Sequence, residues 1–326
     1  MSRSDKPVVA VDIGGTKIIS AVIAGDGRML SRVHSLTLAQ EGPKKVIGRL
    51  VETVKRSIGK ADLQISMIGS ICVAAAGIID HNKGLITEAP NLPGWHNIPL
   101  RNIIAVELDT PVFLLNDASA AALGEHRLGA GQGLDHLIYL TVSTGIGGGI
   151  IINGELYNGA DGCAAEIGHM ILQVDGPACK CGQRGCLEAL ASGTAIARMA
   201  RERLAKGEQS ILTGMVGSIK SVTSELVSVA ARKGDAFACG VIDSAAGYLG
   251  IGLANLVNIF NPQMIIIGGG VSRMGEMLLK PTRKAMKAHA FTLPGRTVHV
   301  VRPGLGLDAG LMGAAVYARQ KGEVMG

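Results

Sequence analysis

Short runs of apolar residues alternate along this chain with glycine-rich turns and with stretches of helical spacing. Runs of strand length lie at Val8–Val11, Ile18–Ile23, Met29–His34, Ile65–Ala74, Val112–Leu115, Leu137–Val142, Ile150–Ile152, Glu155–Tyr157, Met264–Ile267 and Val298–Arg302. Helical spacing predicts helices at Pro43–Ile58, Leu100–Leu108, Ala118–Arg127, Ser192–Lys206, Val222–Arg232, Asp243–Asn258, Lys280–Ala288 and Asp308–Lys321. Strands that alternate with helices in this way indicate an α/β fold.

One sequence of elements occurs twice. A strand, a glycine turn, a second strand, a tight turn and a third strand begin at Val8 and again at Leu137. The two copies share a pattern rather than residue identities. The repetition predicts two related α/β domains that face one another, each of which offers a glycine turn to a shared cleft.

The length and composition agree with two domains. The chain has 326 residues, 47% of them hydrophobic, but only 3% aromatic, and it contains 46 glycines. A chain of this length exceeds one typical core, and its core must be built mainly from aliphatic side chains. We expect a first domain at residues 1–117, completed by a closing helix at 308–326, and a larger second domain at 118–307.

The formal net charge of +6 admits an anionic partner, either ATP or nucleic acid. The basic residues are spread along the chain. Their denser groups, Arg198–Lys206 and Lys280–Lys287, lie in helical stretches without interleaved aromatic residues. Solvated helix faces explain such groups better than a nucleic-acid surface does. We therefore expect no specific nucleic-acid partner.

No targeting or membrane segment is expected. Ser2–Lys6 is polar, and the apolar run that follows it is interrupted by Asp12. The most apolar later stretch, Ala245–Phe260, carries two asparagines and several glycines, which argues against a membrane span. A cytoplasmic location without membrane contact is the resulting prediction.

The most specific motif is a group of cysteines with a nearby histidine: His169, Cys179, Cys181 and Cys186. Three thiolates and one imidazole form a complete tetrahedral set for Zn²⁺, with no position left for water. Such a closed set indicates a structural zinc rather than a catalytic one. The alternatives are a redox pair or a chance cluster of cysteines.

Three glycine turns follow strands and are candidate nucleotide contacts. Backbone N–H groups in such turns can cradle phosphate oxygens, an acid at the strand end can hold Mg²⁺ through water, and a third turn can approach the adenosine. The residues are Asp12, Gly14, Gly15, Thr16 and Lys17 in the first turn, Thr144 and Gly145 in the second, and Gly269 in the third. Each taken alone is equally compatible with an ordinary turn. Neither a Walker A motif nor a strict G-x-G-x-x-G motif after the first strand is present.

Acidic residues provide the candidate catalytic and sugar-binding groups. Asn116 and Asp117 follow a buried strand, where α/β proteins place ligand contacts, so Asp117 could accept the proton of an attacking hydroxyl. They could equally cap the next helix. Glu166 and Glu188, which flank the cysteine motif, could accept hydrogen bonds from sugar hydroxyls, or they could be surface acids.

Taken in order, these motifs resemble the ROK family (repressor, open reading frame, kinase) of sugar kinases. The resemblance rests on Asp12–Lys17, Asn116–Asp117, Ser143–Gly149, Glu166–His169 and Cys179–Glu188, and it extends over nearly the full length. It implies the actin-like ATPase fold, with two ribonuclease-H-like domains around a cleft that holds ATP and sugar. It also implies a homodimer or a homotetramer.

The resemblance implies residue roles as well. Asp117 corresponds to the general base, and Asn116, Glu166, His169 and Glu188 to the sugar-binding set, with Gly77 as a backbone contact. The implied cofactors are ATP, Mg²⁺ and a structural Zn²⁺. Ser143 stands where many members have glycine, a small change that leaves the interpretation of that turn intact.

The predicted function is an ATP-dependent hexose kinase, and the stretch Ala89–Trp95 most resembles members that are glucokinases. Alternatives within the family are N-acetylmannosamine, N-acetylglucosamine or fructose kinases. A further alternative is a sugar-responsive transcriptional regulator, although the first strand near Val8 is expected to leave no room for a preceding DNA-binding module.

Overall fold

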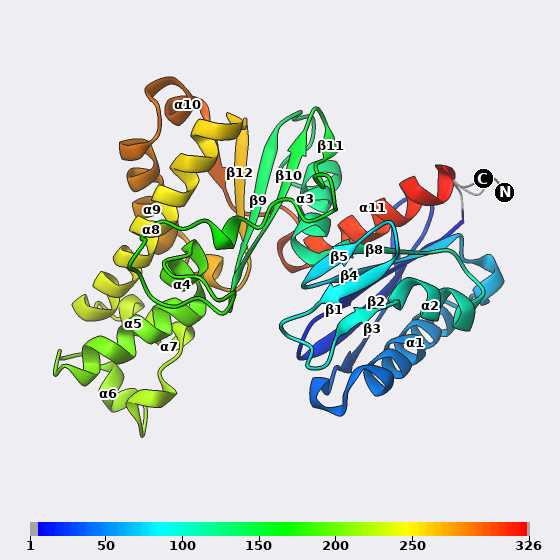
Figure 1. Ribbon diagram of the computed structural model, residues 1–326, viewed down its shortest axis with the longest axis horizontal. Helices are drawn as coiled ribbons and strands as arrows, with labels where there is room; N and C mark the ends of the chain where they lie inside the picture. Colours follow the sequence, from blue (N-terminus) through cyan, green and yellow to red (C-terminus); the bar gives the residue numbers. More distant parts are fainter. Residues whose placement is uncertain (1–5, 325–326) are drawn as a thin grey trace. The chain divides into compact units, whose positions relative to one another are not determined.

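A computed structural model describes residues 6–324 of the chain, and their contacts separate into two compact units (Figure 1). Unit 1 contains the described residues up to Gly133, then Gly149–Ala165, and those from Gly304 onward; unit 2 contains Leu134–Gly148 and Glu166–Pro303. Unit 1 therefore extends past Asp117, after which the sequence suggested a boundary. The reason is that the following helix packs along the closing helix of the same unit.

Unit 1 is built on a five-stranded sheet. Its strands, in spatial order, are β3 (Met29–Leu36), β2 (Lys17–Ile23), β1 (Val8–Ile13), β4 (Ser70–Ala75) and β8 (Val112–Asn116). β2 runs antiparallel to β1 and β3, whereas β1, β4 and β8 run parallel. Because parallel strands have their carboxyl ends on the same side, β1 and β8 end at the same edge of the sheet. Asp12 lies near the end of β1, and Asn116 lies at the end of β8.

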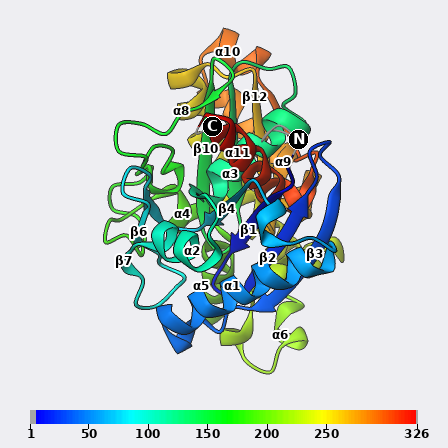
Figure 2. The ribbon, with the colours of Figure 1, turned by 90° about the vertical axis from the view of Figure 1, so that its right-hand side faces the viewer.

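Helices cover both faces of this sheet. Along β1, alternate residues Val9 and Val11 pack in a core with α1 (Pro43–Lys60) and α2 (Leu100–Leu108), whereas Val8 and Ala10 pack in a core with α11 (Ala309–Val324). The period of two places successive side chains on opposite faces. α11 lies along α3 (Asp117–Leu128), and Figure 2 shows this pair apart from α1 and α2.

Three further strands form a small antiparallel sheet within unit 1. They are β5 (Ile78–Asp80), β6 (Leu85–Glu88) and β7 (His96–Ile98). The sequence pattern did not predict them, because each is only three or four residues long. The expected loop around Trp95 is present and connects β6 to β7.

The second sheet repeats the strand order of the first. Its strands are β11 (Glu155–Leu156), β10 (Ile146–Ile152), β9 (Leu137–Val142), β12 (Met264–Gly268) and β13 (His299–Val301). The order 3-2-1-4-5 within each copy confirms the repetition expected from the sequence. β9, β12 and β13 run parallel, as β1, β4 and β8 do.

The remaining helices belong to unit 2. They are α4 (Leu187–Ala191), α5 (Gly193–Ala205), α6 (Leu212–Met215), α7 (Ser224–Arg232), α8 (Ala236–Phe260), α9 (Glu276–His289) and α10 (Thr292–Thr297). Short 3-10 turns occur at Ala39–Glu41, Ile65–Met67, Ile167–His169, Ile219–Ser221, Val271–Met274 and Gly306–Asp308. Ser192 caps α5 and Thr223 caps α7, since each hydroxyl accepts a backbone N–H.

Several predicted element boundaries were wrong, and three of them show why. The run expected as one strand at Ile65–Ala74 begins as a 3-10 turn, and β4 starts only at Ser70. β10 begins at Ile146, within the expected glycine turn, because consecutive glycines do not prevent ladder pairing. α8 begins at Ala236, where the Asp235 carboxylate caps it by accepting the Ala238 N–H at 2.7 Å.

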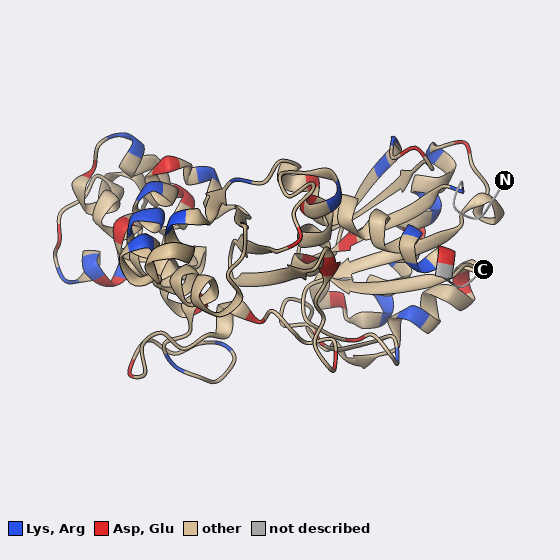
Figure 3. Cartoon of the chain, turned by 90° about the horizontal axis from the view of Figure 1, so that it is seen from above, with Lys and Arg blue, Asp and Glu red and all other residues tan. Residues whose placement is uncertain are grey.

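α8 is long and apolar enough to cross a membrane by length and composition alone, and 56% of its most apolar window is buried inside the protein. Burial of this kind is typical of a core helix. Basic and acidic residues are interspersed along the helices rather than gathered by sign (Figure 3). Arg198 and Glu202 of α5 form an ion pair at 2.8 Å, and Arg203 of α5 pairs at 2.6 Å with Glu208, which follows the helix.

Candidate functional site

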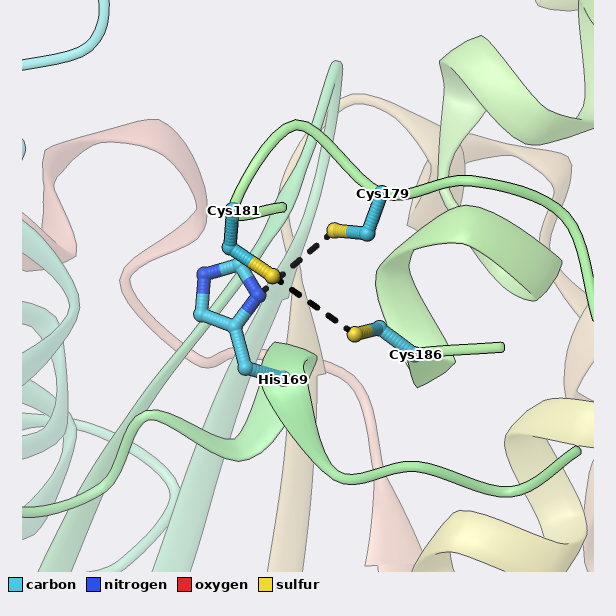
Figure 4. A group of neighbouring side chains, drawn as sticks. All are labelled: His169, Cys179, Cys181 and Cys186. Atoms are coloured by element: carbon cyan, nitrogen blue, oxygen red, sulfur yellow. Dashed lines mark hydrogen bonds between the residues drawn. The ribbon is translucent and has the colours of Figure 1, made fainter. Parts of the chain in front are cut away.

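The structure brings the four predicted zinc ligands together in unit 2 (Figure 4). One possible ligand atom from each of His169, Cys179, Cys181 and Cys186 lies within 4.8 Å of the other three. Cys181 Sγ is 3.7 Å from Cys186 Sγ, and Cys179 Sγ is 3.7 Å from His169 Nδ1. A tetrahedral zinc requires separations of about 3.8 Å between sulfurs and about 3.6 Å from sulfur to nitrogen. The residues therefore fit Zn²⁺, and all three cysteines are free thiols rather than a disulfide.

The loop that carries the cysteines is held by its own backbone. Cys179 N–H donates to the Gln183 carbonyl at 2.8 Å, and Leu187 N–H donates to Met170 at 2.8 Å. Gly185 has a φ of 67° and packs against the Gln173 carbonyl where no side chain would fit. A backbone N–H bond from Gln183 lowers the pKa of the Cys181 thiol, which favours the thiolate that binds metal.

The histidine uses its two ring nitrogens on different sides. Nδ1 faces the cysteines, and Nε2 lies 3.9 Å from an oxygen of Glu166. His169 can therefore bind a metal through Nδ1 while Nε2 remains available to a second partner. Glu166 is exposed and stands just before the 3-10 turn Ile167–His169.

Glu188 connects the cysteine motif with the second glycine turn. It lies on α4, two residues after Cys186, and its Oε2 accepts the Ile146 N–H at 2.8 Å. Its Oε1 lies 3.9 Å from Cys179 Sγ. A side chain at Gly145 would collide with this carboxylate. Glu188 is thus a fixed, half-buried acid rather than a mobile surface group.

The second glycine turn is held by a bond within the turn and by a bond from α5. Ser143 N–H donates to the Gly145 carbonyl at 2.8 Å, and Thr194 Oγ donates to the Thr144 carbonyl at 2.7 Å. Thr144 itself is exposed. Gly269, at a φ of 83°, packs on the backbone of Val142 in the neighbouring strand, where a side chain would collide.

The first glycine turn follows β1 in unit 1. Gly14 N–H donates to the Lys17 carbonyl at 3.0 Å, and Thr37 Oγ donates to the Gly14 carbonyl at 2.6 Å. Thr16 and Lys17 are exposed at the tip. Burial and the nearby charge of Asp117 raise the pKa of Asp12 to about 6, although Lys17 acts in the opposite direction.

Asn116 and Asp117 stand at the junction of β8 and α3. Asn116 Oδ1 caps α3 by accepting the Ala118 and Ser119 N–H groups, and its Nδ2 donates to the Gly77 carbonyl at 3.2 Å. Asn116 therefore provides the helix cap that the sequence left open. Burial raises the pKa of Asp117, and this effect outweighs the Ala118 N–H bond, which acts in the opposite direction. A half-buried acid with a raised pKa at a strand end is typical of a proton-transfer group.

Comparison with known proteins identifies the family. The model of the ROK family matches residues 8–321. The chain belongs to the ROK family. It is 40% identical to a glucokinase from Thermotoga maritima over 314 residues, which cover 96% of this chain and 98% of the relative. A structure of a ROK family glucokinase from Streptomyces griseus in complex with glucose and AMPPNP has a TM-score of 0.82 and 38% identity, covering 96% of this chain and 99% of that one.

Regulators are also among the relatives. A xylose repressor from Caldicellulosiruptor bescii is 33% identical over 87% of this chain and 71% of its own length. Membership of the ROK family confirms the resemblance inferred from the sequence, and the structural relatives confirm the actin-like α/β fold of the family.

Two residues of unit 1 were missed by sequence reasoning. Asn91 lies directly against Gly15 of the first turn. Glu125 in α3 is fully buried, and its carboxylate accepts N–H groups from Ala130 at 2.9 Å, Gly304 at 2.8 Å and Leu305 at 2.7 Å. An acid within an apolar helical stretch was the available signal for Glu125, whereas no local pattern indicates the contact of Asn91.

Proposed function

We propose that this ROK family protein is an ATP-dependent glucokinase that transfers the γ-phosphate of ATP to the 6-hydroxyl of glucose. The observation that carries the proposal is the half-buried Asp117, with its raised pKa, at the same sheet edge as the glycine turn after β1. The glucokinases among its relatives, matched over nearly their full length, support the choice of sugar.

In the proposed reaction, Asp117 accepts the proton of the sugar 6-hydroxyl as that oxygen attacks the γ-phosphorus. The new P–O bond forms while the bond to the leaving ADP oxygen breaks. A base whose pKa lies nearer to neutral matches a weakly acidic hydroxyl better than an ordinary carboxylate does. Asn116 keeps Asp117 in place by capping α3 and by its bond to Gly77.

The other site residues have binding roles in this proposal. The carboxylates of Glu166 and Glu188 accept hydrogen bonds from sugar hydroxyls, and Nε2 of His169 forms a hydrogen bond with a sugar hydroxyl. Gly77 adds a backbone contact. Backbone N–H groups of Gly15, Thr16 and Gly145, with the side chains of Lys17 and Thr144, bind phosphate oxygens. Gly14, whose N–H already donates to the Lys17 carbonyl, permits the close approach of the phosphates, and Gly269 lies near the adenosine. Mg²⁺, when bound, supplies charge neutralisation on the phosphates, and Asp12 would hold it through water.

We further propose that His169, Cys179, Cys181 and Cys186 hold a structural zinc. The separations between their ligand atoms support this assignment. The metal would hold Glu166 and Glu188 in place relative to one another. Glu166 is the N-cap residue of the 3-10 turn that ends at His169, and Glu188 lies two residues after Cys186. A cytoplasmic location and a homodimer or homotetramer remain predictions from the sequence.

The test is ADP release with Mg-ATP across glucose, mannose, fructose, N-acetylglucosamine and N-acetylmannosamine. We expect glucose to have the highest kcat/KM, and we expect Asp117→Ala to lose turnover while it keeps the wild-type circular dichroism spectrum. A different preferred sugar would replace glucose in the proposal. Turnover of none of them, together with sequence-specific DNA binding at physiological salt, would instead favour the regulatory role of the xylose repressors.

A further inference from the structure

The first glycine turn touches a segment that no phosphate contact requires. A Cβ atom built on Gly15 would lie 2.8 Å from the Asn91 carbonyl oxygen and 3.3 Å from Asn91 Cβ. A Cβ on the adjacent Gly14 would meet only the Lys17 carbonyl oxygen, at 3.8 Å. Of these two neighbouring glycines, therefore, Gly15 alone provides the space in which Asn91 rests on the turn.

Asn91 belongs to Glu88–Trp95, which we call the Trp95 segment. Asn91 is exposed, but Leu92 and Trp95 are only 2% and 1% exposed and belong to the same core as Ile13 of β1. Leu92 N–H donates to the Ala89 carbonyl at 2.9 Å, and Trp95 N–H donates to Leu92 at 3.2 Å. Two buried side chains and two local hydrogen bonds restrain the backbone of the segment. A displacement of the backbone at one end is therefore transmitted to the other end.

The beginning of the segment rests on Gly77. This glycine has a φ of 125°, and a Cβ there would collide with the Glu88 carbonyl oxygen and lie 2.9 Å from Ala89 Cα. The Gly77 carbonyl in turn accepts the bond from Asn116 Nδ2 at 3.2 Å, next to Asp117. A continuous path of contacts therefore joins Gly15 to the residues proposed to meet the sugar.

We propose that the Trp95 segment is a positioning element through which Gly15 in the phosphate turn and the sugar-binding edge at Gly77 and Asn116 influence each other. Nucleotide bound in the turn restrains the position of Gly15, and Gly15 restrains Asn91. The segment then restrains Glu88 and Ala89, the backbone that contacts Gly77. By thermodynamic reciprocity, sugar and nucleotide then strengthen each other's binding by the same factor, about 5-fold or more for a typical coupling. The proposal rests on the proposed function and adds to it a route by which the two substrates communicate within unit 1.

A matched pair of variants separates this role from phosphate binding. Gly15→Ala must displace the Asn91 backbone, whereas Gly14→Ala leaves it in place, and neither glycine has a positive φ. Calorimetry gives the glucose Kd of each protein without nucleotide and with Mg-AMPPNP, which resembles ATP but does not transfer its phosphate. We expect Gly15→Ala to weaken glucose binding without nucleotide by about 5-fold or more. Gly14→Ala should keep the glucose Kd measured without nucleotide within about 2-fold of the wild-type value, because this substitution does not displace Asn91.

The unaltered protein offers a second measurement that does not depend on the folding of a variant. Trp95 is the single tryptophan of the chain, so its fluorescence reports on the segment directly. Mg-AMPPNP without sugar should change the Trp95 emission and slow amide hydrogen exchange within residues 88–95. Equal glucose Kd values for Gly15→Ala and wild type would overturn the coupling, as would protection at Gly14–Lys17 with none in the segment. Failure of the wild-type protein to release ADP from Mg-ATP in the presence of glucose would instead reject the proposed function. The two failures are distinguishable, because the exchange experiment uses nucleotide alone.

Discussion

The carboxyl group of Asp12 is held where water cannot fully stabilise its charge, so its pKa rises from 3.8 to about 6. The folded protein therefore binds this proton more tightly than the unfolded chain does. Stability is unaffected below about pH 4 and falls as pH rises between about 4 and 6, by about 3 kcal/mol in total. Asp12→Asn should consequently stabilise the protein by up to this amount at pH 7.5 and little at pH 4, as measured by urea unfolding. An equal effect at both pH values would show that the charge is not the cause.

Asp117 provides a second prediction that depends on pH. Because burial raises its pKa above the ordinary value of 3.8, the base becomes protonated at a higher pH than an exposed acid would. The kcat/KM for glucose should therefore decline with falling pH while the protein is still folded. Asp117→Asn should lower kcat on the order of 10²–10⁴-fold and abolish this decline. The exposed Asp26→Asn serves as the control and should retain the wild-type profile.

Residues with strong chemical signatures were predictable from the sequence, and residues that act through shape were not. The spacing of the cysteines indicated a metal site, and the structure places one possible ligand atom from each cysteine and from His169 within 4.8 Å of the others. The contact of Asn91 with Gly15 depends on a fold that joins positions 76 residues apart, and no local pattern encodes it. The same holds for the N–H groups that Glu125 accepts from Gly304 and Leu305.

At the scale of single elements, the cysteine loop has two glycines in the left-handed region that differ in their surroundings. Gly182 has a φ of 91° and open space around it, whereas Gly185 has a φ of 67° and lies against the Gln173 carbonyl. Alanine at either position costs roughly 1 kcal/mol for the backbone conformation alone. We expect Gly185→Ala to reduce zinc content and glucose affinity far more than Gly182→Ala does. Metal analysis and glucose titration of both variants give the answer, and similar losses would show that backbone strain alone matters.

The contact between α3 and α11 depends on a glycine of α11. A Cβ on Gly313 would collide with the Ala120 carbonyl of α3, whereas a Cβ on Gly310 would lie at an ordinary 3.7 Å from the Asp117 carbonyl. Gly313→Ala should therefore destabilise unit 1 by about 1–3 kcal/mol, the usual effect of overpacking, and Gly310→Ala should not. Thermal unfolding of the two variants tests this, and equal melting temperatures would contradict the close helix contact.

The elements were predicted well where apolar periodicity was long and poorly where it was short. α2 and β9 match their predicted bounds because sharp changes in hydropathy mark both ends. The strands β5, β6 and β7 escaped prediction because three or four residues carry too little alternation. The stretch of α8 before Asp243, about two turns, was missed because alanine, phenylalanine and cysteine there gave no clear polar face.

At the scale of the whole molecule, the proposed zinc belongs entirely to unit 2. A ligand that binds only the folded state stabilises the part of the protein that holds it. Removal of zinc with a chelator should therefore lower the melting temperature of unit 2 and raise the KM for glucose, and added Zn²⁺ should restore both. Hydrogen exchange should show faster opening near residues 169–188, with the first sheet unaffected. Unchanged exchange in that region would exclude a structural role for the metal.

The repeated sequence of elements at Val8 and Leu137 predicted two similar sheets, and the two five-stranded sheets do have the same order of strands. The sequence analysis expected the closing helix to complete the first domain, but it did not predict that Gly149–Ala165 and the stretch from Ala118 to Gly133 also belong to unit 1. The packing of α3 against α11 keeps α3 in this unit, and such a contact depends on side-chain shape in the folded state rather than on any periodicity.

The position of α11 also has a consequence for synthesis on the ribosome. Leu311, Ala314, Ala315 and Ala318 cover the face of the first sheet that carries Val8 and Ala10. At about 5–20 residues per second, roughly 10 to 40 s separate the completion of β8 from the emergence of α11. During that interval the nascent sheet exposes an apolar face, so chaperone binding should be strongest for chains stopped before residue 309. A premature stop codon near the end of the gene would leave a chain that can never cover this face.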